Sequence, residues 1–532
     1  MTTAAQEKTV TINVDGQYLE ATSGATILEA AREVGINIPT LCHHPRLSVV
    51  GSCRVCMVAI EGTKGLVPAC ATPVRNGMIV KTDTPEVLAA RRMAVELMLS
   101  AHPLNCDNCE SNGKCELQTL ADELGVDRSR FPRDQELKPI DERHPFIQYD
   151  PNKCVLCSRC VRACREIAVN DVWTVSGRGK NSMVSTFFDE SLESAGCLSC
   201  GECISVCPTG ALRTKLGVSI SPSDGVKVTR TTCPWCGVGC TIELHTKENK
   251  VIEVTSPPDA PVNKGSLCVK GRYGYDFINH PSRLTKPLIR VKPKSKGVYQ
   301  EEAWQMDFRE ASWDEALDLV AQRLLEIKDK FGSESLAGIS SAKCTNEDNY
   351  VMQRFVREVM GNNNIDHCAR LCHASTVVGA IAAFGSGAMS NSIDDISLAD
   401  VVLVIGSNTT ECHPVIGNII KHAVRFRGTK LIVADPRSIQ LVGHATVHLR
   451  HKPGTDVALL NGLMHVIIKE GLADKDFIKK RTEGFEDLAR VLNGYTPEVV
   501  EEITGVNKED LITAARLFGQ AEKACIIYSM GI

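Results

Sequence analysis

The chain has 532 residues, a formal net charge of −4 and 43% hydrophobic residues, with 40 glycines and 23 prolines. These values exclude a collagen-like or low-complexity chain and give no sign of a basic nucleic-acid-binding surface, and the length suggests about three or four domains. Cysteine is the unusual residue, because 24 are present and 19 of them lie at or before position 268.

The amino-terminal stretch MTTAAQEKTVTINVDG has no apolar signal core and no twin arginine, and the chain contains no long apolar run. A membrane span would need about 18 apolar residues, and a disulfide scaffold is typically short and secreted. We therefore expect a cytoplasmic protein with reduced thiols and no membrane span. Reduced cysteines in tight groups usually hold metal.

The first cysteine group follows a small predicted sheet. Apolar and polar residues alternate over 9–20 around Asp15-Gly16, which predicts a hairpin, and 27–34 predict a short amphipathic helix. The spacing C-x10-C-x2-C-x13-C then comprises Cys42, Cys53, Cys56 and Cys70. Four thiolates on the loops of a small sheet suit a [2Fe–2S] cluster, and structural zinc is the alternative. We assign residues 1–80 to a β-grasp, ferredoxin-like domain.

The second group combines one histidine with three cysteines. It reads H-x3-C-x2-C-x5-C and comprises His102, Cys106, Cys109 and Cys115. Alone, this pattern fits a Cys3His zinc site at least as well as iron. Its position among iron motifs favours a [4Fe–4S] cluster, in which imidazole replaces one thiolate and alters the potential. We assign residues 81–145 to this His/Cys3 domain.

The third and fourth groups repeat one spacing, C-x2-C-x2-C-x3-C, and the second copy is followed by Pro208. This is the run of bacterial two-cluster ferredoxins, in which the last cysteine of each run binds the other cluster. One [4Fe–4S] cluster should therefore use Cys154, Cys157, Cys160 and Cys207. The other should use Cys197, Cys200, Cys203 and Cys164. Residues 146–222 form this predicted ferredoxin domain.

The fifth group lies in TTCPWCGVGC and KGSLCVKGRYG and comprises Cys233, Cys236, Cys240 and Cys268. A zinc ribbon is the alternative to a [4Fe–4S] cluster here. We assign residues 226–288 to a small cluster domain. The five groups together predict one [2Fe–2S] and four [4Fe–4S] clusters, about eighteen irons, which pass single electrons. Such a series of one-electron carriers predicts a site beyond Cys268 that exchanges electrons in pairs. It also predicts a surface near the amino terminus where a partner docks and takes the electrons away.

The second half alternates strands and helices. Strands are predicted at 336–340, 399–405, 430–434 and 524–528, and helices at 350–360, 415–426 and 457–468. Polar residues follow the strands, as in a doubly wound α/β sheet with a nucleotide-type crevice. No G-x-G-x-x-G motif is present, so a standard NAD site is not supported, and an unliganded α/β domain is the alternative. The predicted fold is thus multidomain, α+β followed by α/β over residues 289–532.

From Cys233 onward the chain resembles the molybdopterin oxidoreductases, specifically the catalytic subunit of cytosolic formate dehydrogenases. Residues 1–220 resemble the iron–sulfur arm of the large subunit of respiratory complex I, an arm that NAD-linked formate dehydrogenases share. The motifs that carry the resemblance are CPWCGVGC with Cys268, CVKGRYG, SSAKCTNEDNY, NNIDHCARLCHAST, VIGSNTTECHP, VADPR and HKPGTD.

The resemblance implies roles for individual residues. Cys372 would bind molybdenum or tungsten, His373 would accept a proton, and Lys270 would bridge the fifth cluster and the pterin. A bis-molybdopterin guanine dinucleotide would contact three predicted strand-end groups: Gly406, Ser407, Asn408 and Glu411; Asp435, Pro436 and Arg437; and Lys452, Gly454 and Asp456. The remaining cysteines are expected to be structural: Cys344, Cys368, Cys412 and Cys525.

The implied reaction is the reversible oxidation of formate to carbon dioxide, with electrons exported to flavin or iron–sulfur subunits linked to NAD(P) or ferredoxin. Family members continue for several hundred residues beyond the position of Ile532, so either the chain is truncated or a second chain completes the pterin domains, and we expect the second chain. Three alternatives remain open. The first is a nitrate-type reductase, which is disfavoured because methionine, not histidine, would follow its ligand cysteine. The other two are a complex I-like subunit with a vestigial pterin site and a zinc-structured binding module.

Overall fold

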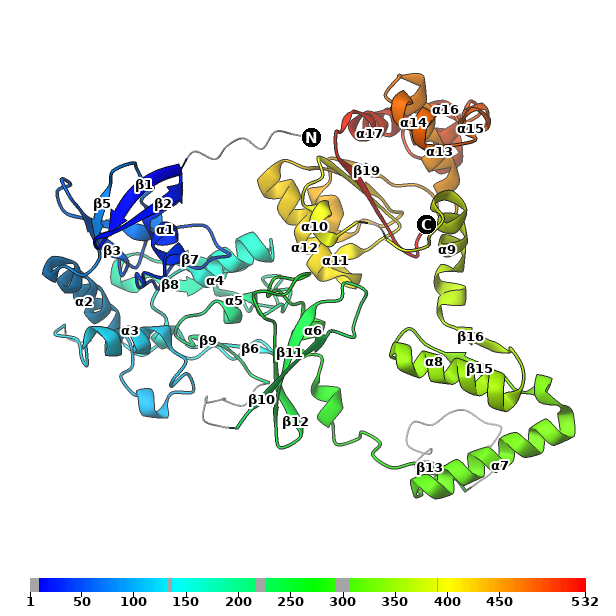
Figure 1. The fold of residues 1–532 in the computed structure, drawn as a ribbon, viewed down its shortest axis with the longest axis horizontal. Helices are drawn as coiled ribbons and strands as arrows, with labels where there is room; N and C mark the ends of the chain where they lie inside the picture. Colours follow the sequence, from blue (N-terminus) through cyan, green and yellow to red (C-terminus); the bar gives the residue numbers. More distant parts are fainter. Residues whose placement is uncertain (1–8, 132–135, 217–224, 292–306, 390) are drawn as a thin grey trace.

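The computed structural model describes residues 9–131, 136–216, 225–291, 307–389 and 391–532 (Figure 1). Residues 1–8 and the predicted domain limit at residue 222 lie outside these ranges. The chain is a multidomain α+β protein, in which the cysteine-rich first half and the α/β second half form separate parts (Figure 1). Within the described ranges, no helix is long and apolar enough to cross a membrane.

The amino-terminal domain is a five-stranded mixed sheet with the strand order β2-β1-β5-β3-β4. Its elements are β1 (Thr9–Val14), β2 (Gln17–Thr22), α1 (Ile27–Glu33), β3 (Met57–Ile60), β4 (Leu66–Pro68) and β5 (Ile79–Lys81). The predicted hairpin is present, with Val14 opposite Gln17. A capping box begins α1, since Glu29 donates its N–H to Thr26 Oγ1 at 3.2 Å and accepts from the Thr26 N–H at 2.7 Å.

The next two predicted domains contain short elements around the cysteine groups. These elements are α2 (Pro85–Leu99), α3 (Glu116–Leu124), β6 (Ile147–Tyr149), α4 (Arg159–Arg162), β7 (Thr174–Ser176), β8 (Met183–Ser185), α5 (Glu202–Ser205) and β9 (Leu212–Thr214). Strands β6 and β9 pair antiparallel, as do β7 and β8. The third cysteine of each ferredoxin run lies in a short helix, Cys160 in α4 and Cys203 in α5. The repeat in the sequence is therefore also a repeat in local structure.

A three-stranded antiparallel sheet connects the two halves of the chain (Figure 1). It consists of β10 (Lys227–Thr232), β11 (Thr241–Lys247) and β12 (Lys250–Thr255), and α6 (Val269–Tyr273) follows. Helix α6 begins directly after Cys268, which is its N-cap residue. The last cysteine of the fifth group thus lies at the start of this helix.

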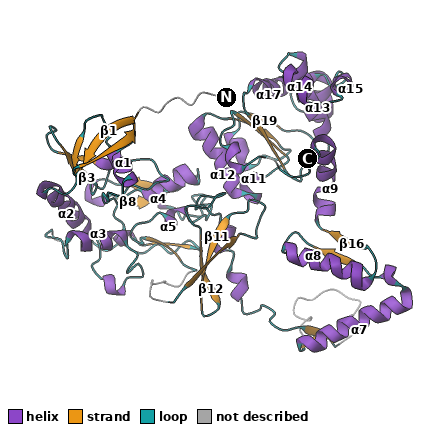
Figure 2. Ribbon diagram, in the orientation of Figure 1, coloured by secondary structure: helices purple, strands orange, loops and turns teal. Residues whose placement is uncertain are grey.

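The second half contains a four-stranded parallel sheet with the order β19-β18-β17-β20. Its strands are β17 (Val401–Ile405), β18 (Lys430–Ala434), β19 (Val447–Leu449) and β20 (Ala524–Tyr528). Helices cover both faces: α10 (Ile393–Ile396), α11 (Thr409–Cys412), α12 (Pro414–His422), α13 (Asp456–Lys469), α14 (Lys475–Arg481), α15 (Phe485–Leu492), α16 (Pro497–Thr504) and α17 (Lys508–Gln520) (Figure 2).

Alternate side chains of the central strand β17 supply the two cores of this sheet. Leu403 and Ile405 pack in the cluster formed with α13, α16 and α17, whereas Val402 and Val404 pack in the cluster that includes Ile420 of α12. A strand buried on both faces needs the continuous apolar run that the sequence has here. The predicted strands at 430–434 and 524–528 have the observed bounds, and the helix predicted at 415–426 is α12 with a further π-helical turn.

The predicted strand at 336–340 does not join this sheet. Only Gly338–Ser340 is extended, as β15, and it pairs in parallel with β16 (Ile365–His367) in a separate two-stranded sheet. Because residue 338 is glycine, the side chains of Val356 and Met352 pack where a Cβ would lie. Nearby elements are β13 (Leu288–Arg290), β14 (Phe308–Glu310), α7 (Trp313–Phe331), α8 (Asn346–Arg354) and α9 (Ala369–Phe384).

Candidate functional site: five cysteine groups and a strand-end crevice

The four cysteines of the first group converge on the loops of the amino-terminal sheet. The Cys42 N–H donates to Cys53 Sγ at 3.4 Å, and the sulfur atoms of Cys56 and Cys70 are 3.3 Å apart. The contact with the Cys70 thiol lowers the pKa of Cys56 to about 7. All except Cys53 are fully buried. This donor set suits a [2Fe–2S] cluster.

The second group brings its three thiols close together at the start of α3. Cys115 is the N-cap residue of α3, and Cys106 begins a short turn before it. Burial raises the pKa of Cys106 and Cys115, and the Cys109 thiolate raises both further. His102 follows the end of α2, where its N–H donates to the Leu99 carbonyl at 3.2 Å.

The two ferredoxin runs exchange their last cysteines in space. Cys207 of the second run lines one small cavity together with Cys154, Cys157 and Cys160 of the first run. Cys164 of the first run lies instead beside the second run, where its thiolate raises the pKa of Cys197, Cys200 and Cys203 in addition to the effect of burial. We call these the A site (Cys154, Cys157, Cys160 and Cys207) and the B site (Cys197, Cys200, Cys203 and Cys164).

The fifth group lines a cavity of its own, formed by Cys233, Cys236, Cys240 and Cys268 with apolar neighbours. Four thiols around an apolar cavity are the donor set and the lining that a [4Fe–4S] cluster needs, and the A site has the same character. Among the residues described, no three His, Cys, Asp or Glu side chains are placed to hold a single metal ion.

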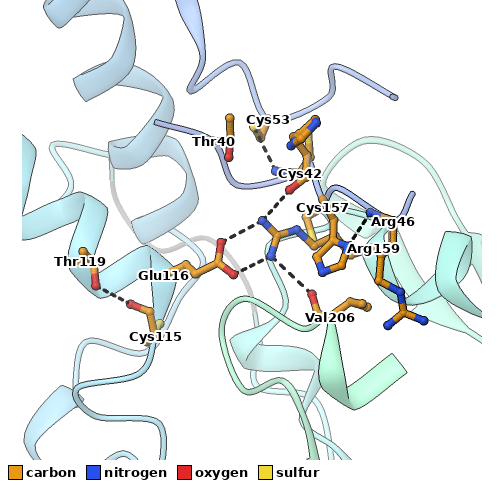
Figure 3. A network of polar contacts seen from close by, with 12 residues as sticks. Thr40, Cys42, Arg46, Cys53, Cys115, Glu116, Thr119, Cys157, Arg159 and Val206 are labelled. Carbon is orange, nitrogen blue, oxygen red and sulfur yellow. Dashed lines mark hydrogen bonds and ion pairs between the residues drawn. The ribbon is translucent and has the colours of Figure 1, made fainter. Parts of the chain in front are cut away.

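Two buried arginines connect the amino-terminal domain, the His/Cys3 segment and the ferredoxin domain, and Figure 3 shows the contacts of the first, Arg159. Arg159 forms a bidentate ion pair with Glu116, at 2.6 and 2.8 Å, and donates to the His43 carbonyl at 2.8 Å. Arg162 donates to the carbonyls of Cys42, at 2.5 Å, and Cys157, at 3.2 Å. A single side chain thus joins the backbone of the first cysteine group to that of the A site.

A second charged group fastens the ferredoxin domain to the fifth site. Glu202, which is 1% exposed, accepts from the Leu267 N–H at 3.1 Å and lies 3.3 Å from an Arg46 nitrogen and 3.7 Å from an Arg272 nitrogen. Arg272 also donates to the Cys200 carbonyl at 2.8 Å. Because Leu267 precedes Cys268, these contacts fix the B site against the fifth site.

Two lysines connect the iron–sulfur half to the α/β half. Lys270 of α6 donates from Nζ to the Glu411 carbonyl at 3.1 Å, so it extends from the fifth site to the predicted pterin crevice. Lys421 of α12 is 1% exposed and donates to the Ala168 carbonyl of the ferredoxin domain at 2.9 Å. Burial lowers the pKa of Lys421.

The predicted pterin contacts gather at one edge of the parallel sheet. Gly406, Ser407 and Asn408 follow β17, Asp435, Pro436 and Arg437 follow β18, and Lys452, Gly454 and Asp456 follow β19. Carboxyl ends of parallel strands form the usual crevice for a dinucleotide. Asp435 is buried and accepts from the Arg437 N–H at 2.8 Å, whereas the Arg437 side chain is exposed. Asp456 lies 2.9 Å from the buried His451 ring.

Cys372 lies close to the same edge. Its Sγ is 3.5 Å from Met530 Sδ, and Met530 follows β20, whose residues pair in parallel with β17. His373 has non-helical dihedrals, φ −137° and ψ 17°, so α9 kinks there, and its Nδ1 lies 3.3 Å from Thr376 Oγ1. The Cys372 side chain is exposed. Of the cysteines expected to be structural, Cys344, Cys368 and Cys412 are exposed and Cys525 is half-buried.

Sequence reasoning did not single out the charged residues that link the domains. These are the buried Arg159, Arg162, Glu202, Arg272 and Lys421 and their more exposed partners Arg46 and Glu116. A usable signal was present for three of them. Arg159, Arg162 and Glu202 lie between or beside closely spaced cysteines of a predicted buried cluster, where a charged residue needs a partner.

The exchange of cysteines between the runs gives a testable prediction. Cys164→Ala is expected to remove the B-site cluster and leave the A-site cluster, although Cys164 belongs to the first run. Iron content should fall by about four atoms, and one [4Fe–4S] signal should disappear from the electron paramagnetic resonance (EPR) spectrum. Cys525→Ala, which changes a half-buried cysteine outside the groups, is the control. Loss of the A-site cluster alone would contradict the exchange.

Five family models match the chain. They are the 2Fe-2S iron-sulfur cluster binding domain (residues 7–85), the NADH-ubiquinone oxidoreductase-G iron-sulfur binding region (91–130), the NADH-quinone oxidoreductase subunit 3 ferredoxin-like domain (144–213), the molybdopterin oxidoreductase Fe4S4 domain (226–280) and molybdopterin oxidoreductase (283–532).

Curated relatives are similar over almost the whole chain. "Probable oxidoreductase YjgC" of Bacillus subtilis is 36% identical over 99% of this chain and 56% of its own length. "Putative formate dehydrogenase YrhE" of the same organism is 35% identical with the same coverage. The chain thus spans about half the length of the curated relatives it matches.

Among solved structures, acetylene hydratase from Pelobacter acetylenicus is similar over 57% of this chain and 40% of its own chain, with 29% identity and a TM-score of 0.50. The family models, the relatives and this structure agree with the resemblance that the motifs indicated. The chain therefore belongs to the molybdopterin oxidoreductases and carries, ahead of its molybdopterin domain, iron–sulfur domains typical of NADH-quinone oxidoreductases.

Proposed function

We propose that this chain is the catalytic subunit of a formate dehydrogenase, which oxidises formate reversibly to carbon dioxide and exports the electrons through five iron–sulfur clusters. The observation that carries the proposal is the position of Cys372. Its sulfur lies beside Met530, next to the strand-end edge where the candidate pterin residues gather. A soft thiolate at a dinucleotide crevice suits a metal that is already held by dithiolene sulfurs.

The overall reaction converts HCOO⁻ to CO2 with release of one proton and two electrons. When bound, the molybdenum or tungsten bis-molybdopterin guanine dinucleotide supplies the two-electron acceptor. The protein's own part is to orient the substrate and to accept the proton, and we assign the proton to the His373 ring, which directly follows the ligand cysteine. Histidine at this position favours formate over a nitrate-type substrate, and the name of the YrhE relative agrees with formate.

The contacts between cysteine groups support an order for electron export. Lys270 extends from the crevice to the fifth site, and Arg272 and Glu202 connect the fifth site to the B site. Arg162 connects the A site to the Cys42 group. The Glu116 N–H, next to Cys115, donates to the Pro208 carbonyl, next to Cys207, at 2.8 Å. The A site is therefore linked to both the Cys42 group and the His/Cys3 group. A flavin or iron–sulfur partner subunit would receive the electrons from these two groups.

The test is anaerobic purification of the complete complex, elemental analysis and EPR spectroscopy after formate addition. We expect about eighteen irons per chain and a molybdenum or tungsten atom. Formate should reduce the iron–sulfur signals and elicit a signal from that metal. Iron without molybdenum or tungsten would favour the electron-transfer subunit with a vestigial pterin site. A zinc-to-iron ratio above one would favour the zinc-structured module, and reduction by another substrate but not formate would overturn the substrate assignment.

A further inference from the structure

Two buried tyrosine hydroxyls lie beside the A and B sites, and the described residues offer them no hydrogen-bond partner other than the thiols of these sites. Tyr149 and Tyr273 are 6% and 4% exposed, and both hydroxyl oxygens are shielded from solvent. A buried hydroxyl that loses its water contacts without a new partner costs about 1–3 kcal/mol. Such groups therefore call for a partner that is bound to the protein in its working state.

Tyr149 is part of the A site. Its side chain lines the cavity that the four A-site cysteines also line. Its hydroxyl interacts with the Cys154 thiol, and burial is the main cause of the raised pKa of Tyr149. The ring packs edge-on against Trp173, with centroids 5.4 Å apart, which fixes the direction of the hydroxyl.

Tyr273 lies in the corresponding position at the B site, although it comes from another domain. Its hydroxyl lies close to Gly201, which stands between Cys200 and Cys203. A Cβ atom built on this glycine would be only 2.8 Å from the hydroxyl oxygen. Burial is the main cause of its raised pKa, and Cys203, Cys200 and Cys197 raise it further. The ring stacks on Phe146 with centroids 4.7 Å apart and an angle of 8° between the planes.

We propose that each tyrosine donates its hydroxyl proton in a hydrogen bond to a sulfur atom of one cluster, Tyr149 at the A site and Tyr273 at the B site, and thereby sets the potentials of the two clusters separately. The inference rests on the proposed clusters. Hydrogen bonds to cluster sulfurs stabilise the reduced, more negative state and raise the reduction potential.

The origin of Tyr273 adds a consequence for the B site. Tyr273 belongs to α6, the helix that starts after Cys268 and carries Lys270. The adjacent Arg272 holds this helix on the Cys200 carbonyl. The B-site cluster thus receives its hydrogen bond only from a docked fifth-site domain, whereas the A-site cluster receives its own from the ferredoxin domain.

The experiment compares Tyr149→Phe and Tyr273→Phe in the complete complex by EPR-monitored redox titration. Phenylalanine keeps the ring packing on Trp173 and Phe146 and removes only the hydroxyl. Tyr149→Phe is expected to shift the A-site equilibrium about tenfold toward the oxidised cluster, a fall of about 59 mV for a one-electron couple, and to leave the B site unchanged. Tyr273→Phe should shift the B-site equilibrium toward the oxidised cluster and leave the A site unchanged. Cys164→Ala, which removes the B-site signal, identifies the two centres.

Tyr275→Phe is the matched control. This tyrosine lies two residues after Tyr273, and its hydroxyl donates to the Leu216 and Ile252 carbonyls at 3.1 and 3.0 Å, not to a thiol. It should shift neither potential. Unchanged potentials in both test variants, or equal shifts of both clusters in either one, would overturn the proposal.

A second measurement does not depend on how well the variants fold. Incorporation of 3-fluorotyrosine throughout the otherwise unchanged chain makes each phenol a stronger donor, so both potentials should rise, and a fall or no change would overturn the proposal. The EPR spectrum of the unmodified complex separates this inference from the proposed function. Absence of [4Fe–4S] signals there would refute the clusters themselves, whereas normal signals with unshifted potentials would refute only the role of the tyrosines.

Discussion

Cys372→Ala is expected to reduce formate oxidation by the assembled complex to below about one hundredth of the unmodified rate. Changes outside the immediate metal ligands typically cost about 10–100-fold, so removal of the ligand itself should cost more. Iron content and the iron–sulfur EPR signals should stay unchanged after chemical reduction, because Cys372 lies outside the five cysteine groups. The measurement is the rate of formate-dependent dye reduction together with elemental analysis.

Cys368→Ala is the matched control for this variant. Cys368 is also exposed and precedes α9 by one residue, but its sulfur accepts the Ala342 N–H at 3.3 Å, whereas the Cys372 sulfur lies beside Met530. We expect this variant to keep most of the activity. Cys372→Ala with more than half of the unmodified rate would refute the assignment of Cys372 as the metal ligand.

Glu202→Ala is expected to destabilise the contact between the ferredoxin domain and the fifth-site domain by about 3–5 kcal/mol. The reason is that removal of the carboxylate leaves the nearly buried Arg272, and also Arg46, without their common anion and the Leu267 N–H without its acceptor. The first transition in urea-induced unfolding of the reduced, cluster-loaded chain should move to lower urea concentration.

An exposed glutamate provides the comparison for this stability measurement. Glu498 lies 3.6 Å from Lys508 at the surface, where water and salt screen an ion pair, so its loss should affect stability little. Glu498→Ala should therefore leave the first transition nearly unchanged. A similarly small effect of Glu202→Ala would show that the buried carboxylate does not stabilise the domain contact.

The sequence was most informative where one local pattern determined the structure. The strands at 430–434 and 524–528 are formed by the apolar runs 431–434 and 524–528, which polar residues flank, and they have the predicted bounds. The repeated cysteine spacing indicated which thiols belong together, and the structure brings Cys207 to the first run as that pattern predicted. These predictions needed no knowledge of distant contacts.

Long-range contacts were not predictable in the same way. Glu202 meets Leu267, and Lys421 meets Ala168, across large separations in the sequence, and no periodic pattern connects such pairs. The strand at 336–340 was predicted as a strand, but its separate pairing with β16 depends on how α8 packs against Gly338. The positions of Tyr149 and Tyr273 likewise follow from tertiary packing alone.

The crossed positions of Cys164 and Cys207 bear on how the protein matures. Neither run can complete a four-thiolate set by itself, so each cluster can form only after both runs have come together. In the unmodified chain, filling of one site should therefore favour filling of the other, whereas Cys164→Ala deletes a B-site ligand and leaves the A-site set complete. Under iron limitation most molecules of the unmodified protein would then hold both ferredoxin clusters or neither, and native mass spectrometry would detect few molecules with one.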